Sequence, residues 1–120
     1  MNGNVAELLV DTDVFVDHLR GDRALRSAGH SVSYSIVTRA ELFAARQGDE
    51  DTVSTLLAPF GEVPIDRAIA ERAGRLRRTL PIRLPDAFIA ATALERGLEL
   101  MTRNRRDFER VPGLMLRDPV

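Results

Sequence analysis

The sequence predicts an α/β domain with a central, mainly parallel sheet, and two observations carry this prediction. Short apolar runs, too short for free-standing helices, alternate along the chain with longer helical segments. This order is typical of strands joined by covering helices. The first apolar run, Leu8–Val10, also ends abruptly at Asp11, and open α/β sheets place their ligands beyond the carboxyl ends of the strands. Asp11 is therefore the first candidate site residue.

The first half of the chain supplies two strand-to-helix transitions and a further helix. The strand Leu8–Val10 is followed by a helix over Val14–Arg20 that Gly21 closes, and Asp13 is a candidate cap for its start. After a loop, the alternating segment Val32–Val37 predicts a second strand. The elements expected after it are a helix from Thr38 to Gly48, a helix over Glu50–Ala58 stopped by Pro59, and a short apolar segment, Gly61–Ile65.

The second half contains two longer helices and returns twice to the sheet. Asp66 caps a helix over Arg67–Leu80, and a break with two prolines follows it. The next helix, Asp86–Gly97, is small and apolar nearly all round, which predicts burial. The remaining expected elements are a strand, Leu98–Thr102, a polar stretch from Arg103 to Arg110, and a last short strand, Leu114–Leu116. With no linker or repeat in between, residues 1–120 read as a single domain.

Composition excludes several classes of function. A chain of 120 residues suits one domain. The absence of cysteine excludes disulfides, thiolate nucleophiles and zinc-thiolate sites. No apolar run approaches the ~20 residues of a membrane span, and the N-terminus lacks the layout of a signal peptide. We expect a soluble, cytoplasmic protein with no membrane partner. The net charge of −1 gives no global attraction for nucleic acid, but all 17 basic residues are arginine, whose planar fork suits phosphate.

Acidic residues follow the predicted strands or open the predicted helices at several points. They are Asp11, Glu41, Asp86 and, after the later strand, Asp107 with Asn104 nearby. In a parallel sheet these positions gather at one edge. At ~4 Å and an effective dielectric constant near 20, each pair of like charges costs roughly 4 kcal/mol, which bound cations or raised pKa values must relieve. Oxygen-only ligands favour Mg²⁺ or Mn²⁺ over zinc, and such a site suits phosphodiester hydrolysis.

Each candidate also has a structural interpretation that involves no metal. Glu41 lies three residues after Thr38, the spacing of a capping box. Asp86 sits where a helix start favours negative charge, although a lone carboxylate at the start of a buried helix needs a partner. Asp107 lies among arginines, a local context that is typical of a solvated surface charge and not of a metal ligand. The arginines themselves form either a solvated face or a set of phosphate contacts, and they are Arg103, Arg105, Arg106 and Arg110.

Taken in order, four segments resemble the PIN-domain ribonucleases, and within them the VapC-type toxins of bacterial toxin-antitoxin modules. The segments are LLVDTDVFVDHLRG, SIVTRAELFAARQG, LPDAFIAATALERG and LMTRNRRDFERVPGL. The resemblance implies a three-layer α/β/α PIN-like domain in which Asp11, Glu41 and Asp86 match the three acidic metal-site residues of the family. Its fourth acid falls in the segment around Asn104 and Asp107, and we favour Asp107. The chain also carries Asp13 where the family commonly has asparagine.

The resemblance implies a toxin that is a Mg²⁺-dependent endoribonuclease, with Mn²⁺ as a substitute, acting on RNA such as transfer or ribosomal RNA. It also implies a homodimer and inhibition by a cognate VapB-type antitoxin. In this interpretation Asp11 and Asp86 hold the principal metal, Glu41 completes the shell or orients the water, and Asp107 fixes a second metal or its waters. The alternative is a catalytically weakened PIN-fold binding module that acts mainly through its antitoxin or RNA partner.

Two other enzyme and signalling families share the opening motif or the architecture. The segment Asp11-Thr12-Asp13 after an apolar strand also looks like the start of the haloacid-dehalogenase phosphotransferases, and the chain resembles signalling receiver domains in length. Both families rely on a lysine, and this chain has none. Phe15 also stands where the first of these families has a small hydroxyl residue.

Overall fold

The computed structural model describes residues 5–45 and 49–119, which build a five-stranded sheet in the order β3-β2-β1-β4-β5. Every neighbouring pair of strands is parallel, which confirms the predicted α/β fold class. The segment Gly61–Val63 is a strand, as its apolar character suggested, whereas the last strand lies slightly later than predicted. The strands are β1 (Glu7–Val10), β2 (Ser31–Ser35), β3 (Gly61–Val63), β4 (Glu99–Met101) and β5 (Leu116–Arg117).

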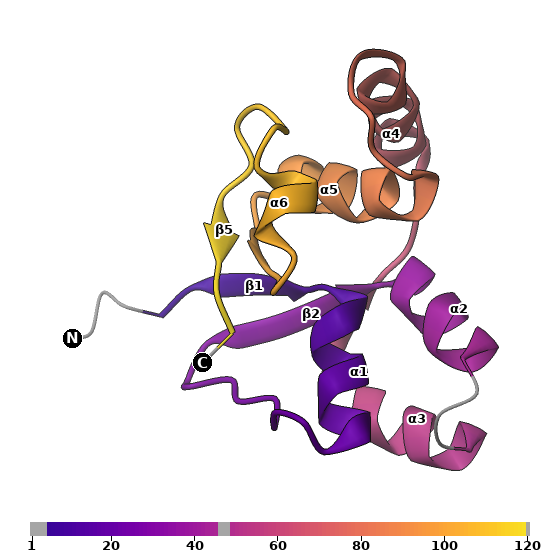
Figure 1. Ribbon diagram of the computed structural model, residues 1–120, viewed down its shortest axis with the longest axis vertical. Helices are drawn as coiled ribbons and strands as arrows, with labels where there is room; N and C mark the ends of the chain where they lie inside the picture. Colours follow the sequence, from indigo (N-terminus) through magenta and orange to yellow (C-terminus); the bar gives the residue numbers. More distant parts are fainter. Residues whose placement is uncertain (1–4, 46–48, 120) are drawn as a thin grey trace.

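Helices cover both faces of this sheet, so the domain has the expected α/β/α layers (Figure 1). One face is covered by α1 (Thr12–Arg20), α2 (Ile36–Ala44) and α3 (Glu50–Leu57). The other is covered by α4 (Arg67–Thr79), α5 (Leu84–Arg96) and α6 (Arg105–Phe108). None of the helices in the described residues is long and apolar enough to cross a membrane.

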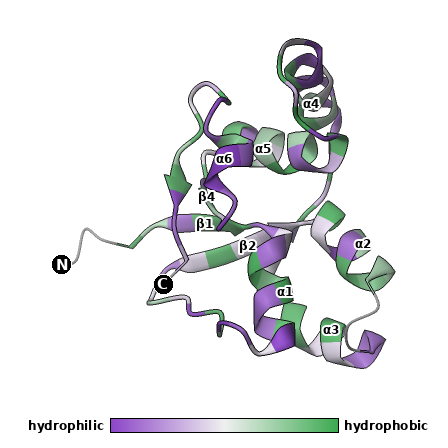
Figure 2. Ribbon diagram, in the orientation of Figure 1, coloured by the Kyte–Doolittle hydropathy of each residue, from purple (hydrophilic) through white to green (hydrophobic). Residues whose placement is uncertain are grey.

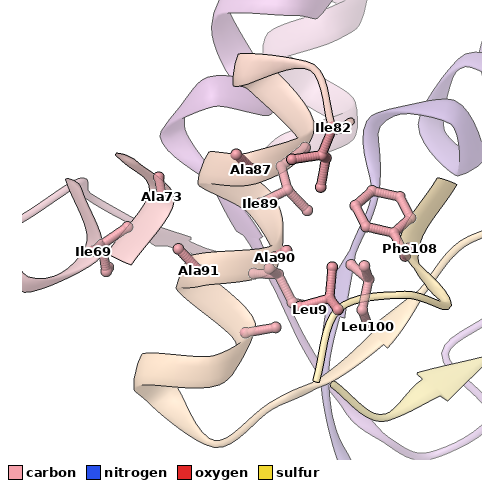
Figure 3. Packing of buried hydrophobic residues seen from close by; sticks show 12 residues of the cluster. Leu9, Ile69, Ala73, Ile82, Ala87, Ile89, Ala90, Ala91, Leu100 and Phe108 are labelled. Carbon is pink, nitrogen blue, oxygen red and sulfur yellow. The ribbon is translucent and has the colours of Figure 1, made fainter. Parts of the chain in front are cut away.

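Strand β1 lies at the centre of two hydrophobic cores because its side chains alternate between the two faces of the sheet. Leu8 and Val10 belong to the core under α1, α2 and α3, and Leu9 belongs to the core under α4, α5 and α6. All three side chains are fully buried, which explains why this strand reads as a continuous apolar run. Figure 3 shows Leu9 and Leu100 of the sheet on the side of α5 that carries Ile89 and Ala90, while Ala87 and Ala91 lie on the side toward Ala73 and Ile69 of α4.

Helix α1 begins at Thr12, two residues before the predicted start. Asp11 is the cap, because its side chain accepts a hydrogen bond from the Thr12 backbone N–H at 2.8 Å. Asp13 lies inside the first turn, so the prediction that Asp13 caps the helix is wrong. Gly21 ends the helix in the left-handed conformation, with φ of 80°, as the sequence predicted.

Helix α2 also begins earlier than predicted. Ser35 is its cap, since the Val37 N–H donates to Ser35 Oγ at 3.0 Å. Thr38 is therefore inside the helix and does not cap it, which rules out the capping box with Glu41. The helix ends at Ala44, while Gly48, its predicted end, lies outside the described residues.

The two helices nearest the later acids also differ from the prediction. Helix α5 begins at Leu84, because Pro85 is accommodated in the first turn, where no intrahelical N–H is needed. Asp86 therefore lies within the first turn and does not precede it. The polar stretch after β4 contains the four-residue helix α6, which was not predicted. Buried Phe108 attaches α6 to the core beside Ile82 and Leu100 (Figure 3), and this anchoring places the polar side chains of α6 next to α5.

Candidate active site

Asp11 lies at the junction of β1 and α1 and is almost completely buried, with 4% of its surface exposed. Its backbone N–H donates to the Met101 carbonyl at 2.9 Å, which continues the pairing between β1 and β4. One carboxylate oxygen accepts from the Thr12 N–H, and the other accepts from the Thr102 hydroxyl at 2.9 Å. The carboxylate is thus held in one orientation by two donors, one directly after β1 and the other directly after β4.

Burial raises the pKa of Asp11 to about 8, with the negative charges of Asp13 and Asp86 adding to the shift. The hydrogen bonds from Thr102 and Thr12 act in the opposite direction because they favour the carboxylate form. Asp11 is therefore mostly neutral at pH 7 in the absence of a cation. A positive charge at this position would restore its ionised form.

Glu41 is tied to α1 through Thr12. The Thr12 hydroxyl donates to Glu41 Oε1 at 2.7 Å, and the same hydroxyl lies 2.9 Å from the hydroxyl of Thr38. Because the backbone N–H of Thr12 also donates to Asp11, this one residue contacts two of the predicted site acids. No other hydrogen bond reaches the Glu41 carboxylate from the described part of the chain, so its second oxygen is available to a ligand.

Asp86 lies in the first turn of α5 and is partly buried. Burial is the largest cause that raises its pKa, to about 6, and Arg83 opposes it. The charges of Asp107, Glu41 and Asp13 raise the pKa further, in that order. These mutual effects show that acids separated by most of the chain lie within electrostatic range of one another at one edge of the sheet.

Asp13 adds a further carboxylate beside Asp11. Its Oδ1 is buried and has no hydrogen-bond partner within residues 5–45 and 49–119, and burial raises its pKa. Its Oδ2 lies 3.5 Å from the Thr102 hydroxyl and 4.0 Å from Nε of Arg103. Arg103 is engaged more closely by Asp17, at 2.9 Å, so Asp13 is only partly neutralised.

The two candidates for the fourth position both lie near these acids, but in different ways. The Asn104 backbone N–H donates to the hydroxyl of Thr102 at 2.9 Å, which joins it indirectly to Asp11. Asp107 is exposed on α6, lines the same pocket as Asp86 and raises the pKa of that carboxyl. The side chain of Asp107 is thus the one that acts electrostatically on the acidic cluster.

Among the residues that the structure describes, no group of three or more acidic or histidine side chains is already arranged to hold a metal ion. The donor set nevertheless fits a hard divalent cation, because it consists of carboxylate oxygens that repel one another. The unpartnered Oδ1 of Asp13 and the raised pKa values of Asp11 and Asp86 are features that a bound cation would relieve.

Sequence reasoning missed the hydroxyl residues that orient the acids. Thr12, Thr38 and Thr102 are partly or fully buried, and each hydrogen-bonds another side chain of the site. The available signal was position: Thr12 directly follows Asp11, and Thr102 ends the apolar run of β4. Arg103 was interpreted only as part of an arginine-rich stretch, although it pairs with α1 through Asp17.

Comparison with known proteins assigns the chain to a family. The PIN domain matches residues 8–114, which is most of the sequence. The chain belongs to the PIN-domain family. Within this family it is 38% identical over 109 residues to Ribonuclease VapC10 of Mycobacterium tuberculosis, covering 81% of this chain and 82% of that protein. It is 35% identical to Ribonuclease VapC19 of the same species, over 88% of this chain and 95% of the relative.

The solved structures that this chain resembles include chains of toxin-antitoxin complexes. A chain in a toxin-antitoxin complex from Klebsiella pneumoniae superposes with a TM-score of 0.75 at 34% identity, covering 90% of this chain and 95% of that chain. A chain of DNA-bound VapBC from Salmonella typhimurium gives a TM-score of 0.82 at 22% identity, covering 95% and 98%, and this likeness shows the fold alone. The resemblance found in the sequence is thereby confirmed.

Proposed function

We propose that this PIN domain is the toxin of a type II toxin-antitoxin module and acts as a Mg²⁺-dependent endoribonuclease. The observation that supports the proposal is the electrostatic interaction of four acids from distant parts of the chain: besides burial, the charge of Asp86 raises the pKa of Asp11, and the charges of Asp107 and Glu41 raise the pKa of Asp86. The ribonuclease names of the VapC relatives support the reaction class. The absence of lysine remains an argument against the haloacid-dehalogenase and receiver-domain alternatives.

The proposed metal ligands differ in burial and therefore in role. Asp11 and Asp86 hold the principal cation, because burial raises the pKa values of both carboxyls to about 8 and about 6, and the charge of Asp86 adds to the shift of Asp11. Glu41, with one oxygen fixed by Thr12, completes the shell or orients the attacking water. Asp107, exposed on α6, helps to hold a second cation or its water molecules. Mg²⁺ is the expected ion, and Mn²⁺ substitutes for it.

The proposed reaction is hydrolysis of an RNA phosphodiester. The water oxygen forms a bond to phosphorus, one phosphorus–oxygen ester bond breaks, and the water proton ends on the leaving oxygen or in solvent. A bound divalent cation supplies charge stabilisation at phosphate oxygens and lowers the pKa of coordinated water. The chain itself contributes orientation: Thr102 and Thr12 hold Asp11, and Thr12 holds Glu41, so the acids need little rearrangement when substrate binds.

The proposed partners follow from the same similarity. The structural neighbours come from toxin-antitoxin complexes, which supports a cognate VapB-type antitoxin for this chain. We also propose a homodimer and a cytoplasmic location. Coexpression with the proposed antitoxin should yield a complex, and light scattering on the separated toxin should give twice the mass of one 13.3 kDa chain. A monomer in that measurement would refute the dimer.

The test of the activity is cleavage of total cellular RNA by antitoxin-free protein with Mg²⁺ or Mn²⁺, compared with EDTA. The control is Asp11→Asn, which removes the carboxylate charge but keeps a side chain that can cap α1. We expect discrete fragments that disappear in EDTA and in the variant. Intact RNA with both metals would favour the weakened binding module, and cleavage that persists in Asp11→Asn would assign the activity to a contaminant.

A further inference from the structure

A pocket of about 260 Å³ opens beside the acidic cluster, between the segment that joins α4 to α5 and the end of α6. Asp86 and Asp107 form part of its lining, so it borders the proposed cleavage site directly. Its volume is below the ~300–1,000 Å³ typical of sites for drug-sized ligands, which suits a single building block of a longer polymer.

One wall of this pocket is apolar and is held by the core. Ile82 and Val111 line the pocket and belong to the hydrophobic core under α4, α5 and α6, where they are 6% and 4% exposed. Leu80, which packs against the same core, also contributes. This wall is fixed by buried neighbours, and it offers a flat ring a surface from which water is excluded.

The lining carries three arginines, Arg83, Arg106 and Arg110, and one acid besides Asp86 and Asp107, which is Glu109. Figure 2 shows the strongly hydrophilic character of α6, which supplies Arg106, against the more apolar α5. Across the described ranges, neither Arg106 nor Arg110 makes a hydrogen bond or an ion pair, and both are exposed. Their guanidinium groups are therefore free to bind an anion.

The neighbouring arginines of the same stretch behave differently. Arg103 pairs with Asp17 at 2.9 Å, and Arg105 pairs with Asp118 at 3.1 Å. The structure thus divides the arginine-rich segment into two members that join parts of the fold and two that face the pocket. Two guanidinium groups without a partner among the described residues therefore line a pocket beside the acidic site, where they can bind an anion.

We infer that this pocket binds one nucleotide of the RNA substrate next to the scissile phosphate. Arg106 and Arg110 contact phosphate oxygens, Arg83 contributes positive charge beside Asp86, and the wall of Leu80, Ile82 and Val111 receives the base. This inference rests on the proposed ribonuclease function and adds a subsite to it. A nucleotide carries both an anionic phosphate, which suits the arginines, and a flat base, which suits the apolar wall.

The test is the affinity of a short, fluorescein-labelled single-stranded RNA of mixed sequence, measured by anisotropy in EDTA so that no cleavage occurs. Arg106→Ala/Arg110→Ala is compared with the matched control Arg67→Ala/Arg78→Ala, which removes the same charge from two exposed arginines of α4 outside the pocket. We expect roughly tenfold weaker binding for the pocket variant and a salt-dependence slope reduced by about 0.7 for each phosphate that the variant no longer neutralises. The control should bind within about twofold of the wild type.

Equal affinities for the two double variants, or no binding by the wild type, would overturn the subsite. Loss of antitoxin binding with unchanged RNA affinity would reassign the pocket to a protein partner and also overturn it. A strand of the same length with abasic sugars tests the apolar wall, and we expect weaker binding than to the RNA. Equal binding of the two strands would contradict a base in the pocket.

Cleavage of total RNA separates this inference from the proposed function. If the wild type binds through the pocket but cleaves nothing with Mg²⁺ or Mn²⁺, the ribonuclease proposal fails, and the pocket remains an RNA-binding site without a scissile phosphate beside it. If the wild type cleaves RNA and the pocket variant binds and cleaves equally well, the subsite fails and the ribonuclease proposal stands.

Discussion

Thr102 donates its hydroxyl hydrogen to Oδ2 of Asp11 at 2.9 Å, across 91 residues of sequence. Both side chains are buried, at the ends of neighbouring parallel strands. The same hydroxyl accepts from the Asn104 backbone N–H at 2.9 Å. One buried hydroxyl therefore orients the central acid and also shapes the segment that leads into α6.

Replacing Thr102 with valine keeps the volume of the side chain but leaves Asp11 and the Asn104 N–H without this partner. We expect the free energy of unfolding to fall by about 1–3 kcal/mol, the usual range for unsatisfied buried polar groups, measured by urea denaturation in EDTA. Thr55→Val, on the exposed surface of α3, should change it by less than about 0.5 kcal/mol. Equal effects of the two substitutions would show that the hydroxyl of Thr102 contributes nothing to stability.

Asp11 should make the metal-free protein less stable as pH rises. Its pKa is about 8 when folded, against an ordinary value of 3.8, so the folded state retains a proton that the unfolded chain has released. Between about pH 4 and pH 8 the unfolded chain binds fewer protons, and the free energy of unfolding declines. Asp86, with a folded pKa of about 6, adds to this decline between about pH 4 and pH 6.

Asp11→Asn, which has no such charge, should flatten this decline. At pH 8 in EDTA we expect the variant to exceed the wild type by on the order of 2 kcal/mol in urea denaturation. The exposed Asp22→Asn serves as the control. A wild-type stability that rises over the same pH range would contradict the raised pKa of Asp11.

The fold could be predicted from the sequence because burial on both faces of the sheet leaves a strong signal. β1 has no polar position after Glu7, and α5 is rich in buried alanine. The starts of α1, α2 and α5 were each predicted two residues late. In α1 and α2 the polar residue that ends the strand is itself the cap, and in α5 a proline occupies the first turn.

The candidate acids could be identified in sequence because each follows a predicted strand or opens a predicted helix, although Glu41 lies in the second turn of α2 and not in the first turn as predicted. Their hydrogen-bond partners could not, since Thr12 meets Glu41 across 29 residues and no local pattern records such a contact. Helix α6 was missed because four residues show no helical period. Its existence depends on Phe108 reaching the core, which is a tertiary contact.

Thr12 should act as a positioning residue for Glu41. Thr12→Val removes the hydroxyl that donates to Glu41 Oε1 but leaves the backbone N–H that Asp11 accepts. We expect kcat for RNA cleavage to fall by about 10–100-fold, as for residues that orient metal ligands, with little change in KM. Thr12→Ser, which keeps the hydroxyl, should recover most of the activity. Failure of serine to recover it would assign the loss to altered packing.

Divalent cations should stabilise the folded protein through the same acids that the proposed function assigns to the metal. Any ligand that binds only the folded state raises the free energy of unfolding, by about 2.7 kcal/mol at a concentration 100 times the Kd. We therefore expect Mg²⁺ and Mn²⁺ to raise the thermal midpoint of the wild type, and to do so more at pH 8 than at pH 5, where Asp11 and Asp86 hold protons that compete with the cation.

Asp86→Asn should abolish most of this increase, because it removes one of the two proposed principal ligands. The substitution lies in the first turn of α5 and leaves the buried alanine face of the helix intact, so the variant should remain folded in EDTA. Glu71→Gln, on the exposed surface of α4, removes the same charge elsewhere and should retain the full response. A response that is equal in Asp86→Asn and Glu71→Gln would show that the cation binds outside the acidic cluster, whatever the RNA cleavage assay reports.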